Sequence, residues 1–164
     1  MNMNNLRERY FSGRAYIGIS PAIFLSASVW FTTDEFAINL GYSFHLYLCC
    51  LLFFVSGFLV SKANAKDPLF SPRVSYTFAF GLSALSISSI LLIIFLNPVY
   101  GLALLFIGLM ALLFSNFSHL LIQKVPSWFK QLIRKINIML CICMIVMLAY
   151  WLNPYTKPLL SIIK

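Results

Sequence analysis

The residues of this sequence that could do chemistry gather in one short segment. Residues 115–123 hold one histidine, two amides and two serines among apolar neighbours. Asn116, His119 and Gln123 stand at positions i, i+3 and i+7, so a helix would carry them as one polar stripe, with Ser115 at its start. Such a stripe can bind a polar headgroup, a quinone carbonyl or a partner helix. Because lipid tails offer these groups no hydrogen-bond partner, we expect the stripe to face protein or water.

The other candidate metal ligands do not converge on one point. His45 falls near the outer end of the second apolar stretch and His119 near the inner end of the fourth, so most of the bilayer should separate them. We expect His45 at the membrane interface, near Asp34 and Glu35. The cysteines form an adjacent pair and a pair two residues apart, unlike Cys-x-x-Cys: Cys49, Cys50, Cys141 and Cys143. The sequence therefore predicts no metal site and no cofactor.

Motifs that mark soluble active sites are absent from the sequence. It contains no nucleophile elbow, no glycine-rich phosphate loop, no zinc-protease motif and no acidic pair inside an apolar stretch. We therefore expect a protein that is not an enzyme. A lipid- or quinone-handling enzyme that uses His119 is the least favoured alternative.

Five apolar stretches must position these residues, and none of them contains Asp, Glu, Lys or Arg. They cover residues 15–31, 40–60, 75–96, 99–122 and 136–152. Each length lies in or near the range of about 17–25 residues with which an α-helix crosses about 30 Å of hydrocarbon. With 61% hydrophobic and 10% charged residues, the chain has too little polar surface for a water-soluble globule. The sequence predicts one all-α integral membrane domain over residues 1–164, a bundle of five transmembrane helices.

The basic residues fall on alternate connections between these stretches, which is one side of the membrane. Ten of the twelve follow this pattern: Arg7, Arg9, Arg14, Lys62, Lys66, Arg73, Lys124, Lys130, Arg134 and Lys135. The positive-inside rule then puts the N-terminus in the cytoplasm and the C-terminus in the periplasm of a bacterial inner membrane. This placement accounts for the net charge of +8 without nucleic acid as a partner.

Aromatic residues give independent support for the ends of the spans. Amphipathic rings prefer the level of the lipid headgroups. Trp30, Tyr100, Tyr150, Trp151 and Tyr155 fall at the outer boundary, and Tyr10, Tyr16, Tyr76 and Trp128 at the inner one. We therefore expect these rings to form two belts at the membrane interfaces.

A cleaved signal peptide is the alternative interpretation of the N-terminus. Basic residues, an apolar run and the small residues Ser26-Ala27-Ser28 are typical of such a segment. Pro21 interrupts the apolar run, however, and the bulky pair Val29-Trp30 follows the small residues. We favour a first span that is retained.

Small residues in the third and fourth stretches predict close helix packing. They recur at helical spacing on one face of each: Gly81, Ala84 and Ser88 in the third, and Gly101 and Gly108 in the fourth. Asn97-Pro98 leaves room for only a tight turn between the two helices, so these must be antiparallel neighbours. The sequence predicts a hairpin whose helices pack through their small faces.

A short basic amphipathic helix is expected over residues 124–136, before the last span. Its apolar face would carry Trp128, Phe129, Leu132, Ile133 and Ile136, and its polar face Lys130, Gln131, Arg134 and Lys135. Such a helix lies in the membrane interface, where each cation contributes about 1 kcal/mol of attraction to anionic headgroups. We therefore expect Trp128, Lys130, Arg134 and Lys135 to face lipids of the cytoplasmic leaflet. A topological anchor is favoured over specific recognition of a lipid or a partner.

Three short motifs lie near the ends of the spans. They are Gly18-Ile19-Ser20-Pro21, Phe53-Phe54-Val55-Ser56-Gly57, and Val125-Pro126-Ser127-Trp128-Phe129 followed by Arg134. With them, the chain from about residue 16 to 152 resembles a family of small five-span bacterial membrane proteins that includes mitochondrial transmembrane protein 69. It departs from the family pattern at Phe58-Leu59, which replace a His-Trp pair, and at Ser115-Asn116, which replace an acidic residue. The resemblance implies a five-span architecture and no mechanism.

Two functions of different classes fit these observations. The first is a non-enzymatic accessory, assembly or lipid-interacting protein, which contacts lipids, a membrane-protein partner or a second copy of itself. The second is a small permease or channel subunit with a path lined by Ser83, Ser86, Asn116 and His119. We favour the first, because ion-coupled transport needs titratable groups at depth and the spans carry only two histidines.

Overall fold

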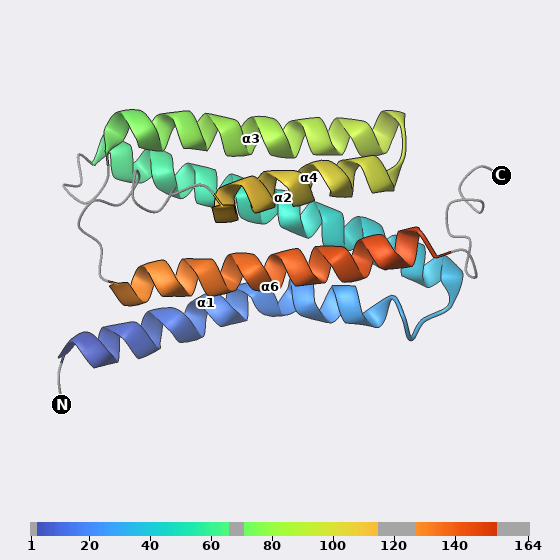
Figure 1. Ribbon diagram of the computed structural model, residues 1–164, viewed down its shortest axis with the longest axis horizontal. Coiled ribbons are helices and arrows are strands. Elements are labelled where there is room, and N and C mark those ends of the chain that lie inside the picture. The colour runs from blue at the N-terminus through green and yellow to red at the C-terminus, as the bar shows by residue number, and fades with distance from the viewer. Residues whose placement is uncertain (1–2, 66–70, 115–126, 154–164) are drawn as a thin grey trace.

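The computed structural model describes residues 3–65, 71–114 and 127–153, with the backbone alone at 3–11 and 112–114. These residues form five helices, shown in Figure 1: α1 (Met3–Ser28), α2 (Asp34–Asn64), α3 (Pro72–Phe95), α4 (Pro98–Phe114) and α6 (Ser127–Trp151). The prediction of an all-helical protein is therefore confirmed for the described part of the chain.

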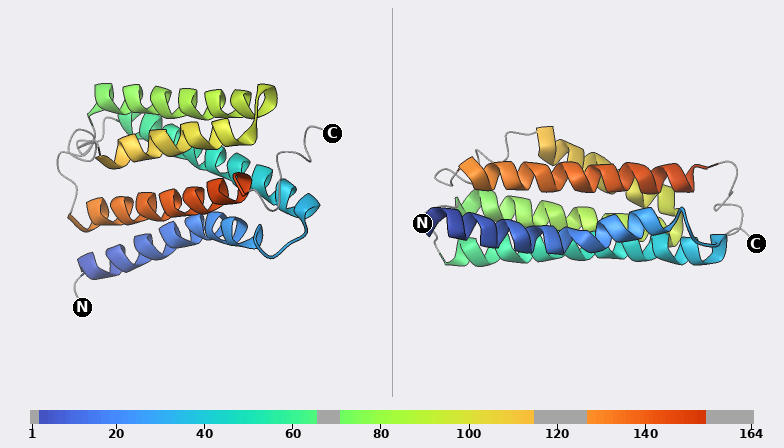
Figure 2. Two further views of the ribbon diagram at one scale, coloured as in Figure 1. Left: turned by 45° about the vertical axis from the view of Figure 1, so that its right-hand side comes forward. Right: turned by 90° about the horizontal axis from the view of Figure 1, so that it is seen from below.

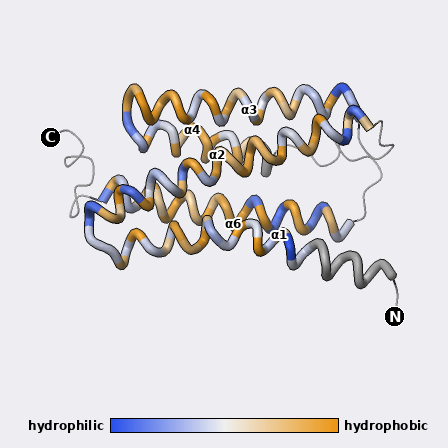
Figure 3. Tube along the Cα trace, turned by 180° about the vertical axis from the view of Figure 1, so that it is seen from behind, coloured by the Kyte–Doolittle hydropathy of each residue, from blue (hydrophilic) through white to orange (hydrophobic). Residues whose placement is uncertain are grey.

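Three of the helices are long and apolar enough to cross a membrane. They are α2, α3 and α6, and a shorter apolar helix accompanies them at Pro98–Ala111. In Figure 3 hydrophobic residues dominate the interior lengths of these helices, while hydrophilic residues gather toward their ends. This agrees with the apolar stretches that the sequence places there.

The second helix is longer than the predicted span of residues 40–60. Its 31 residues correspond to about 46 Å, well beyond about 30 Å of hydrocarbon. In Figure 1 α2 crosses the bundle obliquely, behind α4 and toward α1. A tilt of this kind is how an over-long helix fits into a bilayer.

The principal helix contacts form a closed ring. Each helix packs against its neighbours along the chain, from α1 through α2, α3 and α4 to α6, and α6 returns to α1. Consecutive helices run in opposite directions, so the pair that closes this ring of five, α1 and α6, is parallel (Figure 1). Seen from below, α6 lies over α1 and α2, and α4 slants behind α6 from the level of α3 to above α6 (Figure 2).

The two ends of the bundle differ in charge. Helix α2 ends near Lys62, α3 begins with Arg73, and α6 begins with a basic segment; we call this the basic end. The opposite end carries Asp34 and Glu35 in the first turn of α2, and we call it the acidic end. All basic residues that the structure describes in α2, α3 and α6 thus lie toward one end.

The predicted hairpin of the third and fourth stretches is confirmed. Only Leu96 and Asn97 separate α3 from α4. The Asn97 side chain accepts a hydrogen bond from the backbone N–H of Val99 at 3.2 Å, and its carbonyl accepts one from Tyr100 at 3.1 Å. Asn97 therefore caps the start of α4 and makes the turn tight.

The structure does not show a separate interfacial helix before the last span. Residues 127–136 are the first turns of α6, which continues without a break to Trp151. A helix of 25 residues is about 37 Å long, so its basic first turns can stand beyond the hydrocarbon while the remainder crosses it. The charged segment and the last span are one element because nothing in residues 127–151 interrupts helical hydrogen bonding.

Two aromatic residues predicted for the outer belt lie inside the bundle instead. Tyr150 and Trp151 are each 1% exposed. The Trp151 ring packs on Gly41 of α2, where a Cβ atom would come within 2.8 Å of it, and meets Tyr42 edge to face. The belt prediction fails here because a glycine on the facing helix leaves space that a large ring fills. Trp30 remains 46% exposed at the same end.

Candidate functional site

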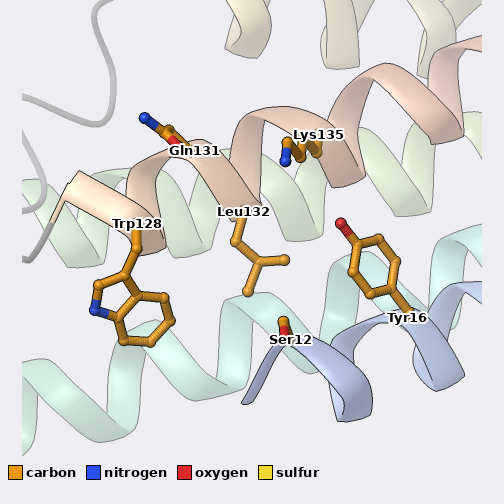
Figure 4. Close-up of a pocket in the computed structure, with 6 residues that line it drawn as sticks. All are labelled: Ser12, Tyr16, Trp128, Gln131, Leu132 and Lys135. Atoms are coloured by element: carbon orange, nitrogen blue, oxygen red, sulfur yellow. The ribbon is translucent and has the colours of Figure 1, made fainter. Parts of the chain in front are cut away.

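A groove opens between α1 and α6 toward the basic end of the bundle. Its cavity has a volume of about 190 Å³ and is lined by Ser12, Tyr16, Trp128, Gln131, Leu132 and Lys135. Figure 4 shows the Tyr16 hydroxyl directed from α1 toward α6, and the Leu132 side chain reaching from α6 toward α1. Leu132 is 7% exposed and forms an apolar floor, whereas Tyr16 is 37% exposed.

Four lining residues come from one face of α6. Trp128, Gln131, Leu132 and Lys135 stand at i, i+3, i+4 and i+7, so regular helix geometry brings them together. This corrects the division expected from the sequence, which placed Gln131 and Lys135 opposite Trp128 and Leu132. The division was wrong because positions i, i+3, i+4 and i+7 share one face of a helix, so polar and apolar residues are mixed on that face.

The α1 side of the groove depends on an irregular helix. Pro21 inside α1 has no N–H for the carbonyl of Ile17, and the Ser20 hydroxyl donates to that carbonyl at 2.8 Å. The carbonyl of Gly18 accepts a hydrogen bond from the Tyr47 hydroxyl of α2. Figure 1 shows that α1 changes direction in its middle part, as a proline predicts. The part of α1 before the bend diverges from α6 (Figure 1), while the Tyr16 side chain still reaches toward α6 (Figure 4).

Positive charge dominates around the groove. Lys135 lines it, and Lys130 and Arg134 occupy other faces of the same turns of α6. The two carboxylates whose side chains the structure describes, Asp34 and Glu35, begin α2 at the acidic end. Neither of these two carboxylates lines the groove beside Lys135, which favours an anion there.

A second polar cluster lies deep among α2, α3 and α4. Ser89 donates a hydrogen bond to the carbonyl of Gly101 at 2.8 Å, and its oxygen is 2.8 Å from Nε2 of His45. Since the one hydroxyl proton goes to Gly101, Nε2 of His45 must be the donor, which leaves Nδ1 as the acceptor of the neutral ring. Nδ1 is buried and has no partner among the described residues.

The structure places His45 inside the bundle and not at an exposed position beside Asp34 and Glu35, which corrects the expectation from the sequence. His45 is 1% exposed. Helix α2 begins at Asp34, eleven residues earlier, so His45 stands about 16 Å along the helix from the acidic end. The predicted span begins at residue 40, so the prediction did not include the helical turns between Asp34 and that residue.

The polar stripe predicted in the fourth span cannot be placed. Ser115, Asn116, His119 and Gln123 lie outside the described residues, since the described part of α4 ends at Phe114. Their role as a ligand site or helix contact stays a prediction.

The predicted small faces of α3 and α4 behave differently. In α4, a Cβ atom at Gly101 would lie 2.8 Å from the Ser89 carbonyl oxygen, and one at Gly108 would lie 2.5 Å from the Leu85 side chain. In α3, Gly81, Ala84 and Ser88 are exposed, and a Cβ atom at Gly81 would have nothing within 4 Å. The hairpin therefore packs through the small face of α4 alone. The opposite face of α3 meets its neighbours because α2, which the local pattern does not reveal, lies on that side.

The hydroxyls proposed to line a transport path are used in the contact between α2 and α3. Ser56 of α2 donates to the carbonyl of Ala79 at 2.8 Å and lies 2.8 Å from the Ser83 oxygen. Ser86 donates to its own helix at Leu82, and the Cys49 thiol donates to the Ser86 carbonyl. These groups have partners within the protein, so the described part of the suggested path consists of helix-packing contacts.

Among the described residues, no three His, Cys, Asp or Glu side chains gather where they could hold a metal ion. The four cysteines are free thiols, with Cys50 exposed and the other three buried. Buried cysteine packs as a small hydrophobic side chain.

Comparisons with models of protein families, with curated proteins and with solved structures give no match to this chain. The resemblance to the five-span family therefore stays a prediction.

Proposed function

We propose that this protein is a non-enzymatic, multi-pass protein of a bacterial inner membrane that interacts with anionic lipids at its basic end. All five helices span the membrane, with the N-terminus in the cytoplasm and the C-terminus in the periplasm. Three long apolar helices and the gathering of described basic residues at one end support this arrangement. The resemblance to the family that includes mitochondrial transmembrane protein 69 belongs to the same proposal.

The groove between α1 and α6 carries the functional part of the proposal. It combines a lysine, a tyrosine hydroxyl, an amide and an indole over an apolar floor, at the end where the basic residues gather. Lysine pairs with anionic headgroups, and tryptophan and tyrosine prefer the headgroup level. A surface of this composition fits the inner interface of a bilayer.

Thermal unfolding in mild detergent tests the lipid interaction. A ligand that binds only the folded protein raises its unfolding temperature. We expect phosphatidylglycerol to raise the unfolding temperature more than phosphatidylcholine at equal concentration, and the difference to shrink as salt is added. Equal shifts with both lipids would rule out a preference for anionic headgroups.

An accessory or assembly role is the second candidate, supported by the exposed face of α3. Gly81, Ala84 and Ser88 leave space for a close-packed helix of a partner or of a second copy. Purification in mild detergent followed by mass spectrometry tests this role, with Gly81→Leu as the variant that should release the partner. Isolation as a lone monomer would count against it.

The permease alternative requires that Asn116 and His119 continue a polar path, which the contacts of Ser83 and Ser86 do not favour.

A further inference from the structure

We infer that the groove between α1 and α6 is a discrete site for one anionic phospholipid, whose phosphate lies between Lys135 and Tyr16. The inference rests on the lipid interaction proposed above and assigns it a location and a stoichiometry. Diffuse attraction to a basic surface needs no cavity, but this site has about 190 Å³, several times the roughly 30 Å³ of one water molecule. A group of phosphate size fits such a space.

The polar groups of the groove match a phosphate and its headgroup. The Lys135 ammonium and the Tyr16 hydroxyl are hydrogen-bond donors, and they approach the groove from different helices (Figure 4). The Gln131 amide can donate to a phosphate oxygen or exchange hydrogen bonds with a headgroup hydroxyl. A ligand that engages both sides links α1 to α6, the two helices that close the ring.

Apolar residues continue the site in the direction that acyl chains would take. Met139 and Ile142 follow Lys135 at i+4 and i+7 on α6, and they are 37% and 55% exposed. On α1, Ile17 next to Tyr16 is 71% exposed. A cationic, hydroxyl-bearing groove that leads into exposed apolar side chains complements a molecule with an anionic head and hydrocarbon tails. A soluble anion would leave the exposed apolar side chains beside the groove without a binding partner.

The chain offers matched controls for a charge substitution in the groove. Lys130 and Arg134 belong to the same turns of α6 as Lys135, but neither lines the groove. Lys130→Gln, Arg134→Gln and Lys135→Gln therefore remove one positive charge each from the same region. Tyr16→Phe removes the hydroxyl and keeps the charge, and because Tyr16 is partly exposed the variant should fold.

Native mass spectrometry of the full chain in mild detergent measures binding of phosphatidylglycerol to each variant, and unfolding temperature confirms that each is folded. We expect one tightly bound lipid in the unmodified protein. We expect Lys135→Gln to weaken its binding by about fivefold or more, since one cation near an anionic headgroup contributes roughly this factor. Tyr16→Phe should weaken binding in the same direction, whereas Lys130→Gln and Arg134→Gln should change it by less than about twofold.

The alternatives give different results. An equal loss in all three charge variants would overturn the discrete site and leave the general lipid interaction standing. Absence of any preference for phosphatidylglycerol over phosphatidylcholine in the unmodified protein would overturn both. Displacement of the lipid by millimolar inorganic phosphate would show a site for a soluble anion and overturn the assignment to a phospholipid.

Discussion

His45 shows how this protein accommodates an imidazole among apolar helices. Its Nε2 is bonded to the hydroxyl of Ser89 on α3, and that hydroxyl donates to the carbonyl of Gly101 on α4. The Ser89 side chain therefore connects α2, α3 and α4. Bonds of this kind between membrane helices contribute about 0.6–2 kcal/mol. Gly101 leaves room for the arrangement, because a Cβ atom there would lie 2.8 Å from the backbone oxygen of Ser89 and 3.1 Å from the imidazole. A buried imidazole among apolar helices often marks a functional position. Here Nε2 takes part in a contact between helices, while Nδ1 has no partner among the described residues.

The first prediction concerns the hydroxyl in this chain of bonds. Ser89→Ala should lower the free energy of unfolding by about 1–2 kcal/mol, because Nε2 of His45 and the carbonyl of Gly101 lose their partner together. Ser88→Ala is the control, since Ser88 is the neighbouring residue and is exposed. Unfolding in detergent, followed by circular dichroism, measures both. Equal stability of the two variants would show that the chain of bonds contributes nothing.

The Tyr47 hydroxyl has a comparable role beside the proline of α1. It bonds the carbonyl of Gly18, close to the position where Pro21 interrupts the backbone pattern. Without this bond, a carbonyl in the apolar part of α1 would lose its partner from α2.

The second prediction therefore concerns Tyr47→Phe. We expect it to destabilise the contact between α1 and α2 by about 1 kcal/mol. Pro21→Ala restores a backbone partner for the carbonyl of Ile17 and not for that of Gly18, so the cost of Tyr47→Phe should be the same in that background. A double-mutant cycle of unfolding free energies measures the coupling. A clear departure from additivity would contradict the explanation.

At the scale of elements, the hairpin of α3 and α4 shows that small residues do not all serve one purpose. Gly101 faces the backbone of α3, Gly108 faces the flexible end of Leu85, and Gly81 faces no atom of the described chain within 4 Å. Backbone cannot yield as a side chain can, so the three glycines should tolerate a methyl group to different degrees.

The third prediction is a ranking of alanine substitutions. Gly101→Ala should destabilise the protein most, by about 1–3 kcal/mol, because α3 and α4 must move apart. Gly108→Ala should cost less, since Leu85 can change rotamer, and Gly81→Ala should cost nothing in the isolated monomer. Thermal unfolding in detergent gives the order. A large loss in Gly81→Ala under conditions where the protein is oligomeric would instead identify a contact between chains.

At the scale of the whole molecule, five helices in a ring bring together the first and last elements of the described chain. Because the ring has an odd number of helices, α1 and α6 are parallel and both begin at the basic end (Figure 1). Asn137 of α6 donates to the carbonyl of Leu109 at 3.1 Å and ties α4 to the closing helix. The groove lies at this closure, between the two helices that come together from opposite ends of the described chain.

The fourth prediction concerns the orientation of the whole chain. Alkaline phosphatase, which is active only outside the cytoplasm, should be active when fused after Lys164 and inactive when fused after Asp67. The reason is that the basic end, with Lys62 and Arg73, should face the cytoplasm. Mass spectrometry of the mature N-terminus provides the control for cleavage of the first span. The reverse pattern of activities would invert the proposed topology.

The sequence by itself determined the helices and the charge difference between their ends. The apolar stretches, Asn97-Pro98 and the basic residues act through neighbours along the chain, and hydrophobic periodicity and turn chemistry report such local interactions directly. Helix ends were predicted less well, as α2 shows, because helical bonding continues through polar residues such as Asp34 and Asn64.

Tertiary structure alone decided which faces of the helices meet. The burial of His45 and Trp151, the exposure of Gly81, and the pairing of Tyr16 with Lys135 across a groove involve residues far apart in the chain. In a membrane, apolar faces are almost equally favourable against lipid and against protein, so hydrophobicity does not select the packed face. Shape and hydrogen bonding between distant residues select it, and these arise only when the helices are assembled.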